Sequence, residues 1–496
     1  MGTQFYTLPV FLTPLLPMRI DTFIPESHKI PSALRSALDI NTALYVRDSR
    51  VADLGISRYI IRVLEHWSSQ FEDFETFYRD LPFGSRIIIE EIVADVRKVR
   101  VQIVKTHYLE KQLLSWATLN EMWDLVPSNT PPLINITDVH VLKQLHDSVS
   151  LVLVDGKKCI LKALTSYPKY LYHELRDLLT LPPHRNMVSR PLHLVTKRVR
   201  FGAKIAVVGF TLKYHEKGTL RDELPLRRIH GLLAMEDHLK WAVQLTDALI
   251  HIRDAGKFYC DLRLDNVVLD ESDDLVMIDF EARGVALGAS APEINYREYI
   301  YTLAMENEED DYPLQKERFV RLYEKMVRGR NIAKPSERYK NPPHGYSVPW
   351  LCLDEREREA AEVYMLGRVL WCIFEGVGSP EKTAMVQHRR EDELEFPQWS
   401  RTPEKVRKLI EKCIQFDGED YRALPVVRRG NKILLRGGGE SQPSEVREVA
   451  MKWWQAELDR AEAFLNQEIT ANHSLDFGRP ILDELLLELR NFERLD

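Results

Sequence analysis

Three oxygen-bearing side chains near the middle of the chain have types and spacing that suit chemistry. Asp261 and Asn266 stand five residues apart in KFYCDLRLDNVVLD, just before a short apolar run, and Asp279 follows the next apolar run in VMIDF. Carboxylates among apolar residues need a partner, because an unpaired buried charge is costly. Carboxylate and amide oxygens are also the ligands that hard cations prefer. We therefore expect this cluster to bind a metal ion or a nucleotide, with structural capping as the alternative.

Further segments of the chain, taken in order with this cluster, resemble the protein kinase superfamily. They are CILK at 159–162, HEL at 173–175, LPPHRNMV at 181–188, LKYHEKGTL at 212–220, MIDF at 277–280, APE at 291–293, EVYMLGRVLW at 362–371 and LIEKCIQFDGEDYR at 409–422. Each match is weak alone, but together they follow the family's order over roughly residues 138–425. The resemblance implies an α+β, bilobal protein-kinase-like fold, with a small β-rich N-lobe and a large helical C-lobe.

The resemblance also assigns the residues that would hold ATP. Lys162 corresponds to the lysine that contacts the α- and β-phosphates, and Glu174 corresponds to its partner on the following helix. Leu212 takes the position of the gatekeeper at the end of a strand. Tyr214 and His215 follow it, where the backbone of the family's hinge meets the adenine.

The metal and transfer positions come from the central cluster. By resemblance, Asn266 and Asp279 would hold Mg²⁺ over the β- and γ-phosphate oxygens, and Asp261 would orient the acceptor hydroxyl and take up its proton. Arg263 replaces the family's lysine beside the γ-phosphate, so the charge is kept while the geometry of the group changes.

Other matches predict contacts that support the site. Glu293 of the APE segment would form a salt bridge with Arg422, and Glu362 stands where the family has an aspartate that holds the backbone of the catalytic loop. Tyr259 is expected to be a core aromatic packed against Phe280.

Four departures from the family pattern bear on activity. The stretch 141–150 before Lys162 contains no glycine, although glycines there let backbone N–H groups approach phosphates closely. Cys260 replaces the arginine that reads an activation-loop phosphate, so control by that route is not expected. Glu281 replaces the glycine after Asp-Phe. Only nine residues separate Glu281 from Ala291, which is short for a shelf that binds a peptide.

The elements that must position these residues follow from local patterns. The segment 150–164 predicts two strands around a turn at Asp155-Gly156, the segment 168–181 predicts a helix stopped by two prolines, and the segment 203–214 predicts a strand. Within 314–329 we expect a helix with Gly329 at its end and an apolar face formed by Phe319, Leu322, Tyr323 and Met326.

Residues 1–130 are expected to be a mainly helical N-terminal extension. Two sets of apolar residues fit helical faces: Ile60, Ile61, Leu64 and Trp67, and further along Ile92, Val96, Val99 and Ile103. The proline-rich stretch near 130 predicts a boundary before a kinase-like domain at 138–425, with an N-lobe at about 138–220, a C-lobe at about 221–425 and an insertion at 294–355. A helical C-terminal tail follows at 426–496.

Bulk properties exclude several classes of protein. The 496 residues are 44% hydrophobic and 29% charged, which is typical of a globular protein with a real core. A net charge of −7 argues against general binding to nucleic acid. Five scattered cysteines without a Cys-x-x-Cys pair indicate reduced thiols. The apolar stretch at 7–18 is broken by prolines and too short to span a membrane. We expect a cytoplasmic or nuclear protein.

The sequence therefore predicts an ATP- and Mg²⁺-dependent phosphotransferase acting on a hydroxyl, with a protein Ser/Thr acceptor favoured by the APE segment, Arg422 and the match at 362–371. The short segment after Glu281 keeps a small-molecule acceptor open. A pseudokinase, a scaffold that uses the fold to hold a partner, is the main alternative, and the missing glycines are its best support.

Overall fold

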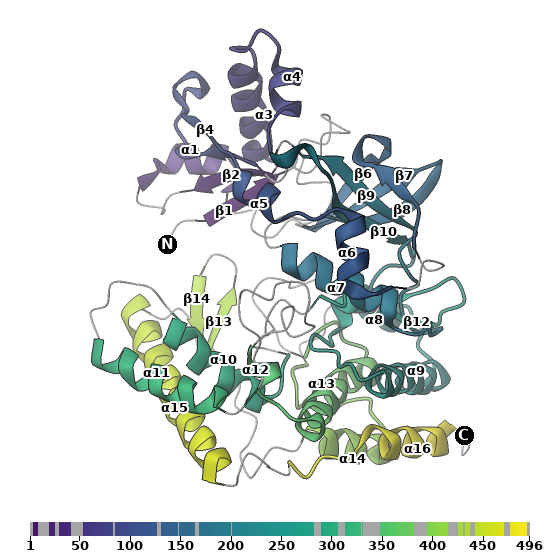
Figure 1. Ribbon diagram of the computed structural model, residues 1–496. Helices are drawn as coiled ribbons and strands as arrows, with labels where there is room; N and C mark the ends of the chain where they lie inside the picture. Colours follow the sequence, from purple (N-terminus) through teal and green to yellow (C-terminus); the bar gives the residue numbers. More distant parts are fainter. Residues whose placement is uncertain are drawn as a thin grey trace. The chain divides into compact units, whose positions relative to one another are not determined.

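The computed structural model describes residues 3–7, 19–24, 29–40, 53–82, 85–125, 130–146, 148–163, 168–199, 201–281, 289–305, 313–328, 330, 348–380, 394–414, 425–429, 432–436, 442–470 and 477–493. The architecture is α+β, with a six-stranded sheet, a four-stranded sheet, two hairpins and many helices (Figure 1). Among the described residues, no helix is long and apolar enough to cross a membrane.

The chain divides into two compact units. The first comprises Met1–Leu179 and Arg190–Tyr214, and the second comprises Thr180–Ser189 and His215–Asp496. The chain passes from the first unit to the second for the last time between Tyr214 and His215, the two residues expected at a hinge. Before that, the short segment Thr180–Ser189, at the end of the helix that carries Glu174, also belongs to the second unit.

The six-stranded sheet of the first unit has the order β5-β9-β10-β8-β7-β6. Its strands are β5 (Leu133–Asn135), β6 (His140–His146), β7 (Val149–Val154), β8 (Lys157–Ala163), β9 (His193–Arg198) and β10 (Ile205–Lys213), and helix α7 (Pro168–Thr180) follows β8. Asp155 and Gly156 both have positive φ, of 49° and 74°, as the two-residue turn between β7 and β8 requires. The predicted hairpin, helix and strand are confirmed.

The N-terminal region contains a sheet that the sequence interpretation missed. Strands β1 (Thr3–Thr7), β2 (Arg19–Ile24), β3 (Arg86–Ile89) and β4 (Val101–Val104) form a four-stranded sheet in that order. Helices α1 (Ser32–Ala37), α3 (Gly55–Ser68), α4 (Phe74–Arg79), α5 (His107–Gln112) and α6 (Trp116–Trp123) accompany it. Residues 1–130 therefore contain a sheet as well as helices, and the prediction of a mainly helical extension did not include that sheet.

One of the two predicted helical faces is absent. Val96 begins a single 3-10 turn, Val96–Lys98, and Ile103 lies in β4, while the predicted face at 60–67 does lie on α3. On α3, Ile60 is buried but Ile61 is 48% exposed. The apolar residues near 92–103 instead pack on the core of this sheet from an extended chain.

The second unit is mostly helical. Its helices are α8 (Leu220–Ile229), α9 (Met235–Asp254), α10 (Pro292–Met305), α11 (Pro313–Val327), α12 (Val348–Leu351), α13 (Glu355–Glu375), α14 (Glu404–Cys413), α15 (Pro443–Thr470) and α16 (Leu482–Glu493). Two hairpins complete it: β11 (Val267–Leu269) with β12 (Leu275–Met277), and β13 (Val426–Arg429) with β14 (Lys432–Leu435). Helix α13 is buried along most of its length.

The predicted insertion and tail share a core with each other. Helices α10 and α11 pack against α15, with Ile300, Phe319 and Leu465 all buried in one cluster. Phe319, Leu322 and Met326 form the expected apolar face of α11, whereas Gly329 lies outside the described residues. Because α16 packs on α9, the residues after 425 belong to the second unit, not to a separate tail (Figure 1).

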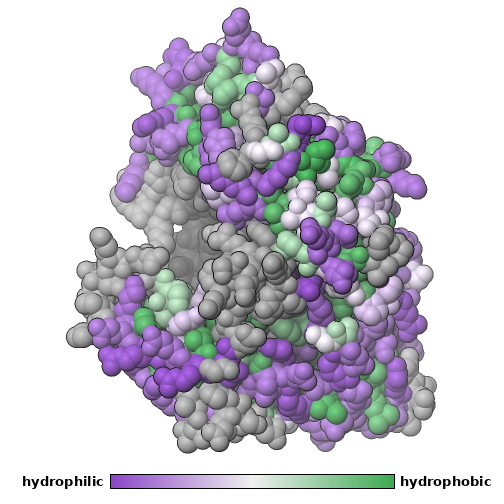
Figure 2. Space-filling view, viewed as in Figure 1, coloured by the Kyte–Doolittle hydropathy of each residue, from purple (hydrophilic) through white to green (hydrophobic). Residues whose placement is uncertain are grey.

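The surface of the second unit over α9, α14 and α16 is largely hydrophilic on the face shown in Figure 2, with a few apolar patches. This agrees with helices that bury one face against the core and expose a charged one to water.

Candidate active site

Lys162 and Glu174 form a buried ion pair in the first unit. Lys162 lies on β8 between neighbouring strands, opposite Val149 of β7 and Phe210 of β10. Its Nζ is 2.6 Å from Glu174 Oε2 on α7, and the two side chains are only 6% and 1% exposed. The sheet thus fixes the lysine backbone, and the helix that follows brings the carboxylate to it.

The residue expected to be the gatekeeper and the two expected at the hinge lie at the end of β10. Leu212 is buried and pairs with Ile160 of β8, whereas Tyr214 and His215 follow the strand without being part of it. The His215 carbonyl accepts a hydrogen bond from Gly218 N–H at 3.3 Å, and Gly218 has a φ of 80°. A glycine-dependent turn therefore follows the expected hinge directly.

Asp261 and Asn266 are in contact in the second unit. The Asn266 Nδ2 group lies 2.9 Å from both the backbone oxygen and the Oδ2 atom of Asp261 and donates to them. Arg263 Nε is 3.7 Å from Asp261 Oδ2 and 3.8 Å from Asp265 Oδ2. The Asp261 Oδ1 atom is buried without a hydrogen-bond partner among the described residues.

Asp279 is tied to the same loop through its backbone neighbours. Ile278 N–H donates to the Asn266 carbonyl at 2.9 Å, and the Tyr259 hydroxyl donates to the Ile278 carbonyl. Tyr259 and Phe280 are in edge-to-face contact, with ring centroids 5.2 Å apart, as expected. Asp279 itself has a φ of 61°, a left-handed conformation that aspartate tolerates better than most residues and that is often found at functional sites.

Negative charge accumulates in this loop. Burial raises the pKa of the Asp261 carboxyl, the Arg263 guanidinium lowers it, and the nearby Asp279 carboxylate raises it. Cys260 is buried, and burial raises the pKa of its thiol, so the thiolate form is disfavoured. Two aspartates and an asparagine, one of them with an unpartnered carboxylate oxygen, are a donor set that fits a divalent cation bound through oxygen.

Glu362 holds the start of the loop. Its Oε1 atom accepts a hydrogen bond of 2.6 Å from Tyr259 N–H, two residues before Asp261. The carboxylate is buried on α13, and burial raises its pKa to about 8. The glutamate that replaces the family's aspartate therefore still reaches the backbone of the loop.

Glu293 forms a buried ion pair with Arg479. Arg479 Nη1 is 2.5 Å from Glu293 Oε1 and Arg479 Nη2 is 3.2 Å from Oε2, with both side chains fully buried. The predicted partner, Arg422, lies outside the described residues. The arginine fork of Arg479 binds both carboxylate oxygens of Glu293, a contact that the sequence interpretation did not predict.

Two arginines form ion pairs near the site that the sequence interpretation did not predict. Arg221, on the first turn of α8, lies 2.6 Å from Asp265 in the loop between Asp261 and Asn266. Arg479 comes from the segment before α16. Neither had a spacing signal, because ion pairs across 44 and 186 residues leave no local pattern.

A tight hairpin stands where the resemblance predicts a glycine-rich loop. Strand β6 ends at His146 and β7 begins at Val149, and these two residues pair with each other. The connection is two residues long and contains no glycine. The connection therefore lacks the glycines that let backbone N–H groups approach nucleotide phosphates closely.

No protein-family model matches this chain, and no curated protein is significantly similar to it. The resemblance to kinases therefore rests on the quoted sequence motifs.

Proposed function

We propose that this chain is an ATP- and Mg²⁺-dependent phosphotransferase with a bilobal protein-kinase-like fold, which transfers the γ-phosphate to a hydroxyl group, most plausibly of a protein Ser or Thr. The observation that carries the proposal is the loop in which Asn266 donates to Asp261 and is bound through its carbonyl to the residue before Asp279. Three oxygen ligands are thus preorganised in one unit, and preorganised charge is what phosphoryl transfer requires of a protein.

Each proposed role follows from the chemistry of the group. Asn266 and Asp279 would hold Mg²⁺, which supplies neutralisation of phosphate charge. Asp261, whose Oδ1 atom has no protein partner among the described residues, would orient the acceptor hydroxyl and accept its proton. Arg263, 45% exposed beside Asp261, would neutralise the transferred group. Lys162 would grip the α- and β-phosphates, with Glu174 holding its ammonium in place.

A pseudokinase is the second candidate, and the hairpin between β6 and β7 favours it. Without a glycine-rich loop, the backbone offers fewer N–H groups to phosphates, so the affinity for nucleotide should be lower than in kinases that have one. The buried Lys162–Glu174 pair opposes this alternative. A scaffold has no need for a lysine buried in the sheet, since apolar residues of similar size would be at least as stable there.

Thermal unfolding with ATP and Mg²⁺ tests the proposal. We expect a rise in the melting temperature that needs both components, because a ligand that binds only the folded state stabilises it. Asp279→Ala should abolish the rise. Asp459→Ala, the same change at a surface position that is 60% exposed, should leave it intact. A melting temperature indifferent to nucleotide and metal would favour the pseudokinase.

Asp261→Ala separates binding from chemistry. The variant should keep the nucleotide-dependent rise in melting temperature but lose phosphate transfer by about 10²–10⁴-fold, the usual contribution of a positioned general base. Labelled ATP with a peptide library and with a pool of small hydroxyl compounds would distinguish the two acceptor classes. Transfer at the wild-type rate by Asp261→Ala would remove Asp261 from the mechanism.

A further inference from the structure

Arg479 is a buried cation at the point where three parts of the second unit meet. Its guanidinium contacts both carboxylate oxygens of Glu293 and donates to the Ala360 carbonyl at 3.0 Å. It also lies over the rings of Tyr364 and Phe477, at 4.9 and 5.2 Å from their centroids. Arg479 thus joins the first turn of α10 to the middle of α13, with the segment before α16 as the third partner.

Stability alone does not account for a fully buried charge pair. Removing two charges from water is costly, and a well-packed apolar pair of similar volume is often as stable or more so. What an arginine fork adds is geometry, because its donors hold a carboxylate in one fixed orientation. The pair between Arg479 and Glu293 therefore fixes how the segment before α16 is aligned with the start of α10.

The turn of α13 that Arg479 holds is also the turn that holds the proposed catalytic loop. Ala360 lies two residues before Glu362, which accepts the hydrogen bond from Tyr259 N–H. On the same helix, the Arg358 guanidinium lies 4.8 Å from the Phe258 ring centroid. Residues 258 and 259 are thus held from α13, immediately before Asp261.

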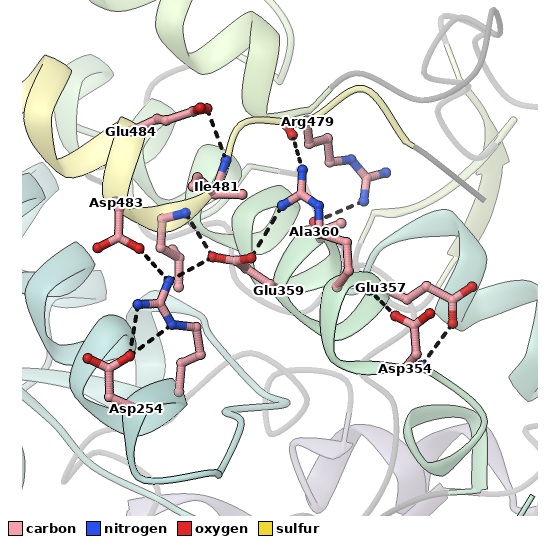
Figure 3. Close-up of polar contacts among 12 residues, drawn as sticks. Asp254, Asp354, Glu357, Glu359, Ala360, Arg479, Ile481, Asp483 and Glu484 are labelled. Carbon is pink, nitrogen blue, oxygen red and sulfur yellow. Dashed lines mark hydrogen bonds and ion pairs between the residues drawn. The ribbon is translucent and has the colours of Figure 1, made fainter. Parts of the chain in front are cut away.

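The residues after Arg479 bind the preceding turn of α13 as well. The Arg479 carbonyl accepts a hydrogen bond from Arg356, and Leu482 N–H donates to Glu359 Oε1 at 3.0 Å (Figure 3). Arg253, at the end of α9, contacts both Glu359 and Asp483, at 3.0 and 2.7 Å. Figure 3 shows these side chains converging from α9, α13 and the segment that leads into α16.

We infer that Arg479 is a positioning residue for the loop that carries Asp261, and that it acts by aligning α13 with the start of α10. The loop follows the end of α9 and is held by α13, and residues 479–483 bind both helices. A change at Arg479 should therefore loosen residues 257–264 before it loosens the rest of the unit. The consequence for activity rests on the proposed function, whereas the consequence for the loop does not.

Amide hydrogen exchange tests the positioning without reference to activity. In Arg479→Met, peptides covering 257–264 should exchange about tenfold faster or more, because the free energy of local opening falls, while the six-stranded sheet keeps its wild-type rate. Arg479→Lys keeps the charge but loses the fork, so a smaller acceleration is expected. Arg490→Met is the matched control, since Arg490 is 48% exposed on helix α16 and forms an ion pair with Asp247 at 3.3 Å.

Steady-state kinetics give the second measurement. Because small misplacements of a catalytic group cost about 10²-fold in rate, kcat should fall by about that factor in Arg479→Met, with the KM for ATP within about twofold of the wild-type value. Rapid exchange at 257–264 in a chain whose wild type transfers no phosphate would support the positioning and reject the proposed function. Rapid exchange with unchanged kcat would overturn the link to catalysis.

Two outcomes would overturn the inference entirely. One is wild-type exchange at 257–264 in folded Arg479→Met. The other is acceleration spread evenly over the second unit, which would assign Arg479 a role in global stability only. If Arg479→Met does not fold because Glu293 is left buried and unpaired, the double variant Glu293→Met/Arg479→Met removes both charges and should fold. Slow exchange at 257–264 in that double variant would equally count against the positioning role.

Discussion

Lys162 and Glu174 depend on each other, because each is buried with the opposite charge as its neighbour. Breaking a buried ion pair leaves one charge uncompensated, at a cost of about 3–5 kcal/mol. We expect Glu174→Leu to lower the free energy of unfolding by about this amount, measured by urea denaturation. Lys162→Met/Glu174→Leu should recover most of the loss.

Glu317→Leu provides the control for that experiment. Glu317 is 65% exposed and pairs with Arg321, so its removal should change the free energy of unfolding by about 0–1 kcal/mol. A double variant at 162 and 174 that is as unstable as Glu174→Leu would show that packing, not charge, sets the cost.

Glu362 should make stability depend on pH. Burial raises its pKa in the folded chain to about 8, from an ordinary value of 4.5. Between these values the folded chain keeps a proton that the unfolded chain has released, so the contribution of Glu362 is complete below pH 4.5 and is lost as the pH rises through 8. Glutamine carries no ionisable proton but can still accept the Tyr259 N–H bond.

We expect Glu362→Gln to become more stable relative to the wild type as the pH rises. The difference in unfolding free energy between the variant and the wild type should increase with pH between about 5 and 8, by at most about 1.4 kcal/mol per pH unit, and level off above 8. Urea denaturation at several pH values measures this difference. A difference that stays constant with pH would mean that Glu362 titrates alike in both states.

At the scale of elements, the sequence predicted the helices and strands whose ends are set by nearby turn residues and prolines. The turn at Asp155-Gly156 and the prolines after Thr180 fix the ends of β7, β8 and α7 within a few residues. Between 92 and 103, apolar residues spaced at three, four and seven fit a helix equally well on paper. There, pairing of Val101–Val104 with the isoleucine-rich strand β3 decided the structure, and strand pairing is a tertiary effect.

The packing of α16 on α9 gives a prediction with a close internal control. Leu485 is fully buried in α16, whereas Leu487, two residues on, is 63% exposed. Leu485→Ala should cost about 2–5 kcal/mol, the range for a buried leucine that leaves a cavity. Leu487→Ala should lie within about 0.5 kcal/mol of the wild type. Equal effects of the two changes on urea denaturation would contradict the inclusion of α16 in the second unit.

At the scale of the whole molecule, the sequence indicated the α+β composition but not how the segments group. Asp261 and Asn266 could be placed together because they stand five positions apart, so their contact is local in the sequence. Which segments belong to one unit depends on contacts between residues far apart in the sequence, and no local sequence pattern predicts such contacts. Arg479 meets Glu293 across 186 residues, and it is this contact, with α16 on α9, that incorporates the C-terminal residues into the second unit.

Within the first unit, one hydroxyl group connects the N-terminal region to the six-stranded sheet. The Tyr172 hydroxyl on α7 accepts a hydrogen bond from Leu114 N–H at 2.9 Å and donates one to the Val207 carbonyl at 2.8 Å. Val207 N–H in turn donates to the Leu114 carbonyl at 2.9 Å. These bonds lie at Val207, where the register of β10 against β9 shifts. The irregularity of the strand thus frees backbone groups that Leu114 and Tyr172 satisfy.

Tyr172→Phe removes that hydroxyl with almost no change in volume. Leu114 N–H would lose a bond in a part-buried position and the Val207 carbonyl would lose one in a buried position, so we expect a loss of about 1–3 kcal/mol in the free energy of unfolding. The amide of Leu114 should also exchange faster than in the wild type, because the hydroxyl that accepts its hydrogen bond is gone. Tyr108→Phe, at a tyrosine that is 50% exposed, should change neither quantity. An unchanged Leu114 amide in Tyr172→Phe would mean that water replaces the hydroxyl, so that the Tyr172 hydroxyl is not needed to hold the N-terminal region to the sheet.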